Sequence, residues 1–358
     1  MLPKVASVFA ISLLLNSATA NSQSAAIDLA PFGYKKVMSG RYVAPASLSY
    51  VGDNALFVTF PTDRTFAPHG QSFDYMGIVV SREGNQIGKT QLSGLYEDLL
   101  QKRITTQPLS NVLVKVGDQL RIYGLNLASF QSVEVPSKSQ LRISPDRKSV
   151  VAISQDGNKS MDTIVAIQGA SSKIDHLDFN ERAVRDGLLA VSNDGSIAHA
   201  IRDSDGELAV HSWSIRWPVF GVGKYQEPFA FTKSDELLVS AMATTPFPPT
   251  KLYLWKQNGE ILKIRGSKAG FYSNAQLSLD GHRVLLTQTE INDFLVLMGG
   301  GDCGSCGESY YYSVVDIPSA KVLFKRKQAW NCSVALAPSG KEVAELCDGV
   351  IRFTPVKN

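Results

Sequence analysis

Long hydrophobic runs, basic runs and familiar cofactor motifs are all scarce in this sequence. No segment after the first 20 residues offers about 18 consecutive apolar residues, so we expect no transmembrane segment there. Basic residues form no long run and the formal net charge is only +3, so nucleic acid is not an expected partner. There is no P-loop, no dinucleotide-binding glycine motif and no Gly-x-Ser-x-Gly. We therefore predict no cofactor, no bound metal and no catalytic residue.

The first 20 residues have the pattern of a cleavable export signal. Lys4 forms a short basic region, residues 8–15 are apolar, and small residues stand at 18 and 20, where signal peptidase needs them. We therefore expect cleavage after Ala20 and a secreted or periplasmic protein. We also expect it to be a monomer.

The chain is rich in a repeated pattern: alternating apolar residues, a tight turn and a second apolar strand. Asp-Gly and related pairs supply the positive φ that a hairpin turn requires. The turns of the clearest copies lie near residues 146, 194, 235, 280 and 339, in steps of 48, 41, 45 and 59 residues. A second hairpin follows several copies, as at Asn258-Gly259. Such a period, built from strands, is typical of propeller blades.

Two hairpins per period make a four-stranded blade, so the predicted fold class is all-β, a β-propeller of about seven four-stranded blades. Residues 21–358 divide into about seven units of about 45–48 residues, and we expect them to form a single domain. Six or eight blades are the alternatives. The second unit, within residues 95–135, fits the pattern least, and residues 93–104 read as a short helix there.

The turn sequences resemble the WD40-like repeats of secreted bacterial β-propellers of the TolB type. The matching stretches are Ser144-Pro145-Asp146, Ser192 to Gly195, Ser278 to Gly281 and Ala337 to Gly340. The Trp-Asp dipeptide of eukaryotic WD40 repeats is absent, and so is the added hydrolase domain of propeller-bearing peptidases. The resemblance implies a fold and no activity.

Cys332 and Cys347 are placed symmetrically about one hairpin turn. In an exported protein an even number of cysteines favours disulfides, and this chain has four. The turn is centred between Ser339 and Gly340, so the two cysteines face each other across two antiparallel strands. We predict a disulfide between them; the alternative is a pair of buried free thiols.

Cys303 and Cys306 lie in a glycine-rich stretch, GGGDCGSCGES. A zinc ribbon would need a second Cys-x-x-Cys, and the pair lacks the α/β context of a thioredoxin-like site. A papain-type thiol is disfavoured because no histidine follows His282. We predict a local Cys303–Cys306 disulfide that pins a loop; a four-cysteine metal site is the alternative.

The connections between the second and third strands of a blade are often long, as at 61–74, 244–250 and 298–309. Long loops on a rigid scaffold usually carry binding. We predict a non-catalytic binding or scaffold module that engages a protein or a glycan through this long-loop face. Its candidate binding residues are Phe66, His69, Phe73, Phe247 and Asp302. The alternative is a propeller hydrolase, lactonase-like, with a metal or acid/base site in the central channel.

Overall fold

The structure is a computed structural model of the chain. It describes residues 26–39, 42–43, 46–62, 72–96, 111–135, 139–156, 159–166, 173–177, 189–200, 208–210, 225–242, 251–266, 271–291, 308–329 and 331–357. Cys303, Cys306 and the expected export signal lie outside these residues, as do Phe66, His69, Phe247 and Asp302.

Within the described residues, antiparallel strands build seven sheets of three or four strands. The first sheet contains β4 (Ser47–Tyr50), β5 (Ala55–Pro61), β6 (Ser72–Ser81) and β7 (Gln86–Tyr96). The second contains β8 (Asn111–Val116), β9 (Gln119–Gly124) and β10 (Phe130–Glu134). The third contains β11 (Gln140–Ile143), β12 (Ser149–Asp156), β13 (Lys159–Ala166) and β14 (Lys173–Leu177).

The remaining sheets follow the same order along the chain. The fourth contains β15 (Ala190–Val191), β16 (Ile197–Ala200) and β17 (Leu208–Val210). The fifth contains β18 (Tyr225–Phe231), β19 (Leu237–Met242), β20 (Lys251–Trp255) and β21 (Ile261–Lys263). The sixth contains β22 (Phe271–Leu277), β23 (Arg283–Ile291), β24 (Glu308–Asp316) and β25 (Lys321–Gln328). The seventh contains β26 (Ser333–Leu336), β27 (Glu342–Cys347) and β28 (Val350–Pro355), with β1 (Ile27–Asp28) on its edge.

Two short elements lie outside these sheets. A 3₁₀ helix, η1, spans Ala30–Phe32, and β2 (Met38–Ser39) pairs with β3 (Tyr42–Val43). No helix in the described part of the chain is long and apolar enough to cross a membrane.

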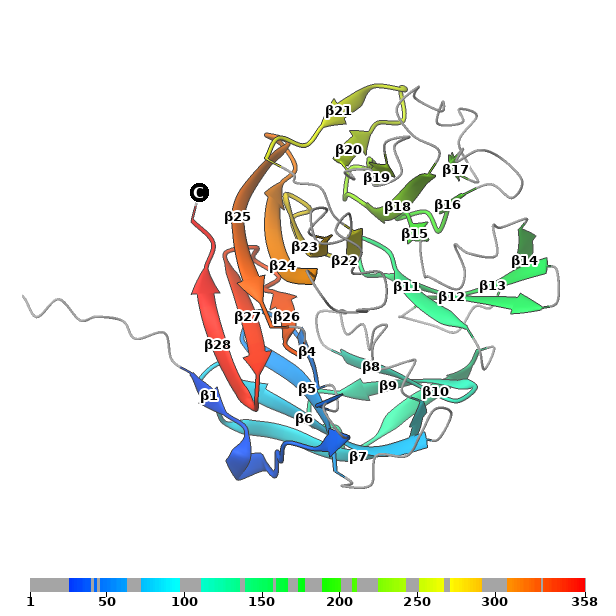
Figure 1. Ribbon diagram of the computed structural model, residues 1–358. Coiled ribbons are helices and arrows are strands. Elements are labelled where there is room, and N and C mark those ends of the chain that lie inside the picture. Colours follow the sequence, from blue (N-terminus) through cyan, green and yellow to red (C-terminus); the bar gives the residue numbers. More distant parts are fainter. Residues whose placement is uncertain are drawn as a thin grey trace, which may run out of the picture.

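The predicted all-β fold is confirmed, and the sheets stand side by side around a centre (Figure 1). One expectation was wrong: residues 93–96, read as the start of a helix, form the end of β7. Their backbone continues the pairing with β6, so tertiary pairing overrides the local helical pattern. The seven sheets agree with the repeat count, while the number of blades stays a prediction.

Apolar clusters hold neighbouring sheets together. Strand β5 is buried at every position because it is covered on both faces, as expected for a sheet between two others. Its Leu56 and Val58 pack against Ala344 and Leu346 of the seventh sheet, whereas Phe57 packs against Val112 of the second. The first sheet is therefore sandwiched between the second and the seventh.

The N-terminal segment clasps the last turn of the seventh sheet. Ile27 pairs with Ile351, and the Leu29 amide donates to the Gly349 carbonyl at 2.8 Å. The Tyr34 ring lies so close to Gly349 that an added Cβ would stand 2.4 Å from Cδ1. Lys36 Nζ lies 2.7 Å from Asp348 Oδ1. We call residues 27–36 the N-terminal clasp.

A second link between the first and seventh sheets is polar. Arg82 donates to both carboxylate oxygens of Glu342, from Nε at 3.1 Å and from Nη2 at 2.9 Å. Tyr50 donates to the same carboxylate at 2.9 Å, and burial followed by the charge of Glu342 raises the pKa of this phenol. The guanidinium also lies 3.3 Å from the centre of the Phe353 ring. Two-point pairing of this kind fixes geometry as well as charge.

Candidate functional site

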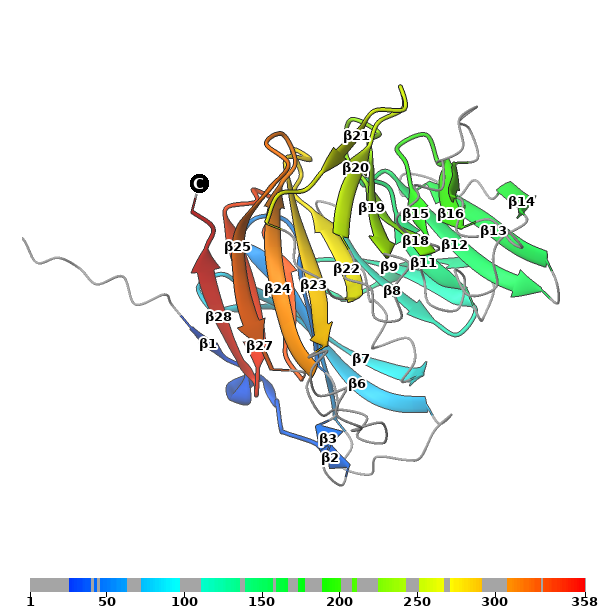
Figure 2. The same ribbon diagram turned by 45° about the horizontal axis from the view of Figure 1, so that its top comes forward.

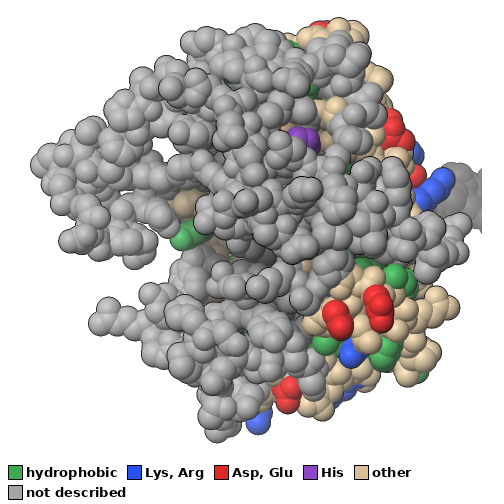
Figure 3. Space-filling model, turned by 90° about the vertical axis from the view of Figure 1, so that its right-hand side faces the viewer, with side chains coloured by type: hydrophobic (Ala, Val, Ile, Leu, Met, Phe, Trp, Pro, Cys, Tyr) green, Lys and Arg blue, Asp and Glu red, His purple; other side chains and the backbone are tan. Residues whose placement is uncertain are grey.

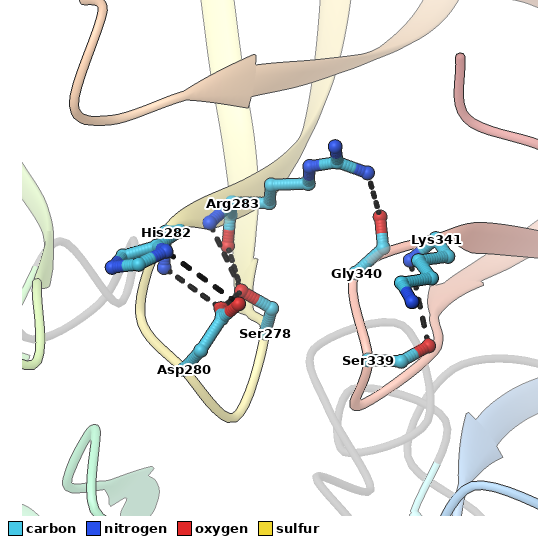
Figure 4. Close-up of polar contacts among 7 residues, drawn as sticks. All are labelled: Ser278, Asp280, His282, Arg283, Ser339, Gly340 and Lys341. Atoms are coloured by element: carbon cyan, nitrogen blue, oxygen red, sulfur yellow. Dashed lines mark hydrogen bonds and ion pairs between the residues drawn. The ribbon is translucent and has the colours of Figure 1, made fainter. Parts of the chain in front are cut away.

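Hydrogen bonds close the turns that join the first and second strands of the sheets, and three of these turns use the same serine and aspartate. In the sixth sheet, Ser278 Oγ donates to Asp280 Oδ1 at 2.5 Å and accepts from the Arg283 amide at 2.9 Å (Figure 4). The His282 amide donates to the same Asp280 oxygen at 2.9 Å. We call these turns, at 51–54, 144–148, 192–196, 232–236, 278–282 and 337–341, the inner turns.

The serine–aspartate contact recurs in the two other inner turns that contain Ser-x-Asp. Ser144 Oγ donates to Asp146 Oδ1 at 2.6 Å, and Ser192 Oγ donates to Asp194. Burial raises the pKa of Asp280, but the hydrogen bonds from Ser278 and the His282 amide outweigh it, so the pKa lies below its ordinary value. The repeated serine and aspartate therefore close the turn, which explains the TolB-like turn pattern.

Ser278, Asp280 and His282 do not form a catalytic triad, although all three residue types are present. The His282 ring lies 3.7 Å from Asp280 through Nδ1, while the Ser278 hydroxyl points to the aspartate (Figure 4). Ser278 is 1% exposed, whereas a nucleophile must reach its substrate. The serine is thus a structural part of the turn.

Neighbouring inner turns are joined to one another. Ser339 donates its amide to Asp53 of the first sheet at 3.0 Å, and Arg283 Nη1 donates to the Gly340 carbonyl at 2.9 Å (Figure 4). On the other side, Asn193 bridges two turns: it accepts from the Asp146 amide at 2.8 Å and donates to the Lys233 carbonyl at 3.0 Å.

The Gly281 position is packed tightly against a neighbouring turn, because an added Cβ would stand 2.4 Å from Lys233 Cβ. Burial raises the pKa of Asp235, and the nearby carboxylates Asp194 and Asp146 raise it further. The inner turns of the third to the seventh sheets and of the first therefore gather at one end of the molecule.

Arg147 occupies the middle of this group of turns. It belongs to the third sheet, yet its Nη2 donates to the Leu277 carbonyl of the sixth sheet at 2.9 Å. The side chain is 6% exposed and the backbone has a positive φ of 61°. Burial lowers the pKa of Arg147 to about 10, and the charge of Asp53 from the first sheet opposes this shift. The residue thus remains charged at neutral pH and fills the end of the strands where the turns meet.

A second repeated contact joins the first strand of one sheet to the start of the next sheet through a side chain and a backbone carbonyl. Arg142 and Gln276 both stand two residues before the serine of an inner turn. Arg142 Nε donates to the Leu189 carbonyl at 3.0 Å, and Gln276 Nε2 donates to the Val334 carbonyl at 3.2 Å. Each acceptor stands three residues before the inner turn of the next sheet, so the two contacts are equivalent. The sequence reasoning missed Arg142, Gln276 and Arg147; the shared repeat position of the first two was the available signal.

The predicted Cys332–Cys347 disulfide is confirmed. The Cα atoms lie 4.6 Å apart, and the pairing of Ser333 with Leu346 sets the register that the turn symmetry predicted. Glu345 stands beside the bridge, so these three residues form one group of possible metal ligands in the described part of the chain. Both sulfurs are joined to each other, however, and a metal requires thiolates.

Among the predicted binding residues, only Phe73 falls within the described residues. It was expected in a loop over 61–74, but its backbone pairs with Leu95 in β6, so the connection between β5 and β6 is shorter than expected. The predicted end of the loop at residue 74 was wrong, because the pairing of β6 with β7 begins at Ser72, before the clear alternation of apolar residues in the sequence. The Cys303–Cys306 bridge and the roles of Phe66, His69, Phe247 and Asp302 stay predictions.

No protein-family model matches the chain, and no curated protein matches its sequence. Solved structures do resemble it. The WD40 domain of Toxoplasma gondii coronin has a TM-score of 0.51 at 9% identity, covering 90% of this chain and 84% of that one. An acylaminoacyl peptidase from Pyrococcus horikoshii has a TM-score of 0.53 at 10% identity, covering 88% of this chain and 53% of that one. TolB from Acinetobacter baumannii has a TM-score of 0.42 at 12% identity, covering 83% and 80%. At these identities the likeness concerns the fold alone, and the first two structures, with TM-scores above 0.5, confirm the β-propeller.

Proposed function

We propose that this β-propeller is a non-catalytic binding module of the cell envelope or the secretome. It engages a protein or a glycan with the ends of the sheets opposite the inner turns. Its first 20 residues serve as an export signal, and a disulfide between Cys332 and Cys347 suits an oxidising compartment.

The observation that carries the proposal is the burial of Arg147 among the inner turns. Hydrogen bonds between turns occupy that end of the strands, and Arg147 fills its middle. Strands in each sheet are antiparallel, so the connections between second and third strands start at the other end. Residues 63–71, 243–250 and 292–307 belong to these connections. The described strands β5, β19 and β23, which lead into these connections, end at that side.

Phe66, His69, Phe73, Phe247 and Asp302 are the residues proposed to make the contact. Aromatic side chains combine a large apolar area with few rotatable bonds, so they are favoured as anchors in interfaces. The alternative is a hydrolase, lactonase-like, with a metal or acid/base site in the central channel.

Site-specific photo-crosslinking tests the proposal. Benzoylphenylalanine is placed at Phe66 or Phe247, and at exposed Lys148 or Lys233 in the inner turns as matched controls. The protein is illuminated in the producing cells. We expect adducts of defined mass from the first pair and none from the second. Adducts from the inner turns alone, or turnover of lactone or ester substrates by the purified protein, would overturn the proposal.

A further inference from the structure

Strand β25 lies on the outer edge of the sixth sheet. The strand order β22-β23-β24-β25 leaves it with a partner strand on one side only. None of its eight residues is buried, and Val322, Leu323 and Phe324 stay half-exposed. An edge strand presents a row of backbone donors and acceptors to any extended chain that reaches it.

The strand is strongly cationic. Its sequence, KVLFKRKQ, holds four cations and no carboxylate. Successive side chains of a strand point to opposite faces, so Lys325 and Lys327 lie on one face and Arg326 on the other. Lys325 Nζ stands 4.4 Å from the centre of the Tyr311 ring, and Arg326 Nη1 donates to Thr354 of β28 at 3.0 Å. Arg326 also faces Glu345 at 3.9 Å, so the charge offered to a chain laid along this edge comes mainly from Lys325 and Lys327.

Two described carboxylates stand near β25, and both have partners. Asp316 accepts hydrogen bonds from Ser319. Glu345 is 7% exposed and faces Arg326 at 3.9 Å. β25 and β28 lie beside each other in both views (Figures 1 and 2). On the opposite side of the molecule, the described side chains visible in Figure 3 mix carboxylates with cations.

One residue of extended chain already sits on this edge. Arg265 forms a parallel bridge with Lys321: its amide donates to the Ala320 carbonyl at 2.7 Å, and its carbonyl accepts from the Val322 amide at 2.9 Å. The described pairing stops at Gly266, which has a φ of 81°. Beyond Val322, no described strand pairs with this edge.

We propose that β25 is a docking edge for an extended segment, rich in aspartate and glutamate, of a partner protein. The segment adds a further strand beside residues 323–328, so that backbone hydrogen bonds supply affinity and opposite charges supply selectivity. A second copy of this chain suits the edge less, because two β25 strands would bring like charges together. This surface is separate from the long-loop face, so the proposal stands independently of the proposed function.

Fluorescence anisotropy with a labelled peptide tests the proposal. The probe is a peptide of about eight residues that alternates glutamate and valine, the usual length of a paired strand. A peptide with lysine in place of glutamate is the charge control. Two further peptides are N-methylated at every second residue, one in each of the two phases, so that each lacks the amide hydrogens along one of its edges. We expect binding by the glutamate peptide and by one of the two N-methylated peptides, and none by the lysine peptide or by the other N-methylated peptide.

Protein variants locate the surface. We expect Lys325→Glu combined with Lys327→Glu to weaken binding by about tenfold or more, because like charges then face each other. Lys89→Glu combined with Lys148→Glu makes the same charge change on β7 and an inner turn, and should change the affinity less than about twofold. Three outcomes would show unspecific charge attraction and overturn the proposal. They are an equal loss of affinity in both variants, equal binding of the two N-methylated peptides, and displacement of the peptide by polyphosphate at the same concentration of charge. A β25-dependent dimer in sedimentation would overturn it as well. The peptide series leaves the protein unchanged, so it tests the docking edge even where a variant fails to fold.

Discussion

Arg147 and Leu277 belong to sheets that are not neighbours, yet the guanidinium of Arg147 donates a 2.9 Å hydrogen bond to the Leu277 carbonyl. This buried cation links the third and sixth sheets, which share no paired strands. Removing it should therefore affect the whole fold rather than one turn.

Arg147→Ala should lower the free energy of unfolding by about 2–4 kcal/mol, because it leaves the part-buried Leu277 carbonyl without its donor and empties the space that the buried side chain fills. The positive φ at this position is equally unfavourable for both side chains, so the comparison isolates the guanidinium. Urea unfolding measures the change. Lys148→Ala, at the exposed next residue, is the control and should stay within about 0.5 kcal/mol. An equal effect of the two substitutions would contradict the central role of Arg147.

Gly281→Ala should destabilise the protein by about 2 kcal/mol more than Gly117→Ala. Both glycines have positive φ, 72° and 60°, so the backbone strain is similar. Only at Gly281 does the new Cβ meet the neighbouring turn, 2.4 Å from Lys233 Cβ, while Gly117 has open space. Thermal unfolding of the two variants, side by side, makes the comparison. Similar melting temperatures would mean that the inner turns are not in firm contact.

The stability of the protein should rise between about pH 8 and pH 10.5. Burial lowers the pKa of Lys115 from 10.5 to about 8 in the folded protein, with Asp118 opposing the shift. Below pH 8 both states carry the proton and the folded state bears the full desolvation cost. Above it the folded state releases the proton first, and the unfolded state binds more protons, so unfolding becomes less favourable as pH rises. Lys115→Met should flatten this part of the profile, and Lys89→Met, at an exposed site, should not. Urea midpoints at a series of pH values measure both; a wild-type profile as flat as that of Lys115→Met would refute the assignment.

Loss of the Cys332–Cys347 bridge should lower stability by about 2–4 kcal/mol through a less restricted unfolded chain. Cys347 directly precedes the turn at Asp348 and Gly349 that the N-terminal clasp holds, so the clasp should loosen as well. Cys332→Ser combined with Cys347→Ser should speed tryptic cleavage at Lys35 and Lys36. Unchanged cleavage with reduced stability would separate the bridge from the clasp.

Peptide mapping without reduction should find Cys303 linked to Cys306. The ring closes too few residues to stabilise the fold much, so Cys303→Ser combined with Cys306→Ser should change the urea midpoint far less than loss of the hairpin bridge. A link from either residue to Cys332 is incompatible with the Cys332–Cys347 pair and would refute the prediction.

The elements that the sequence predicts well are those built from local signals. Alternating apolar residues and Asp-Gly turns depend on neighbours within one hairpin, so the inner turns and the register of Cys332 with Cys347 could be inferred. Arg147 could not, because its partner Leu277 stands 130 residues away and no periodicity connects them. The cationic edge escaped notice for a related reason. Four cations in eight residues are too few for a basic run, and their effect depends on β25 being at the edge of its sheet.

The pairing of Ile27 with Ile351 has a consequence for the order of assembly. Ribosomes add about 5–20 residues per second, so β1 is complete long before its partner β28 exists. During this interval the apolar face of the first sheet, which later packs against Ala344 and Leu346, has no cover. The apolar face of the first sheet thus stays exposed until the last strands have been synthesised. A chaperone that binds the nascent chain would have to cover this face until the C-terminal strands are available.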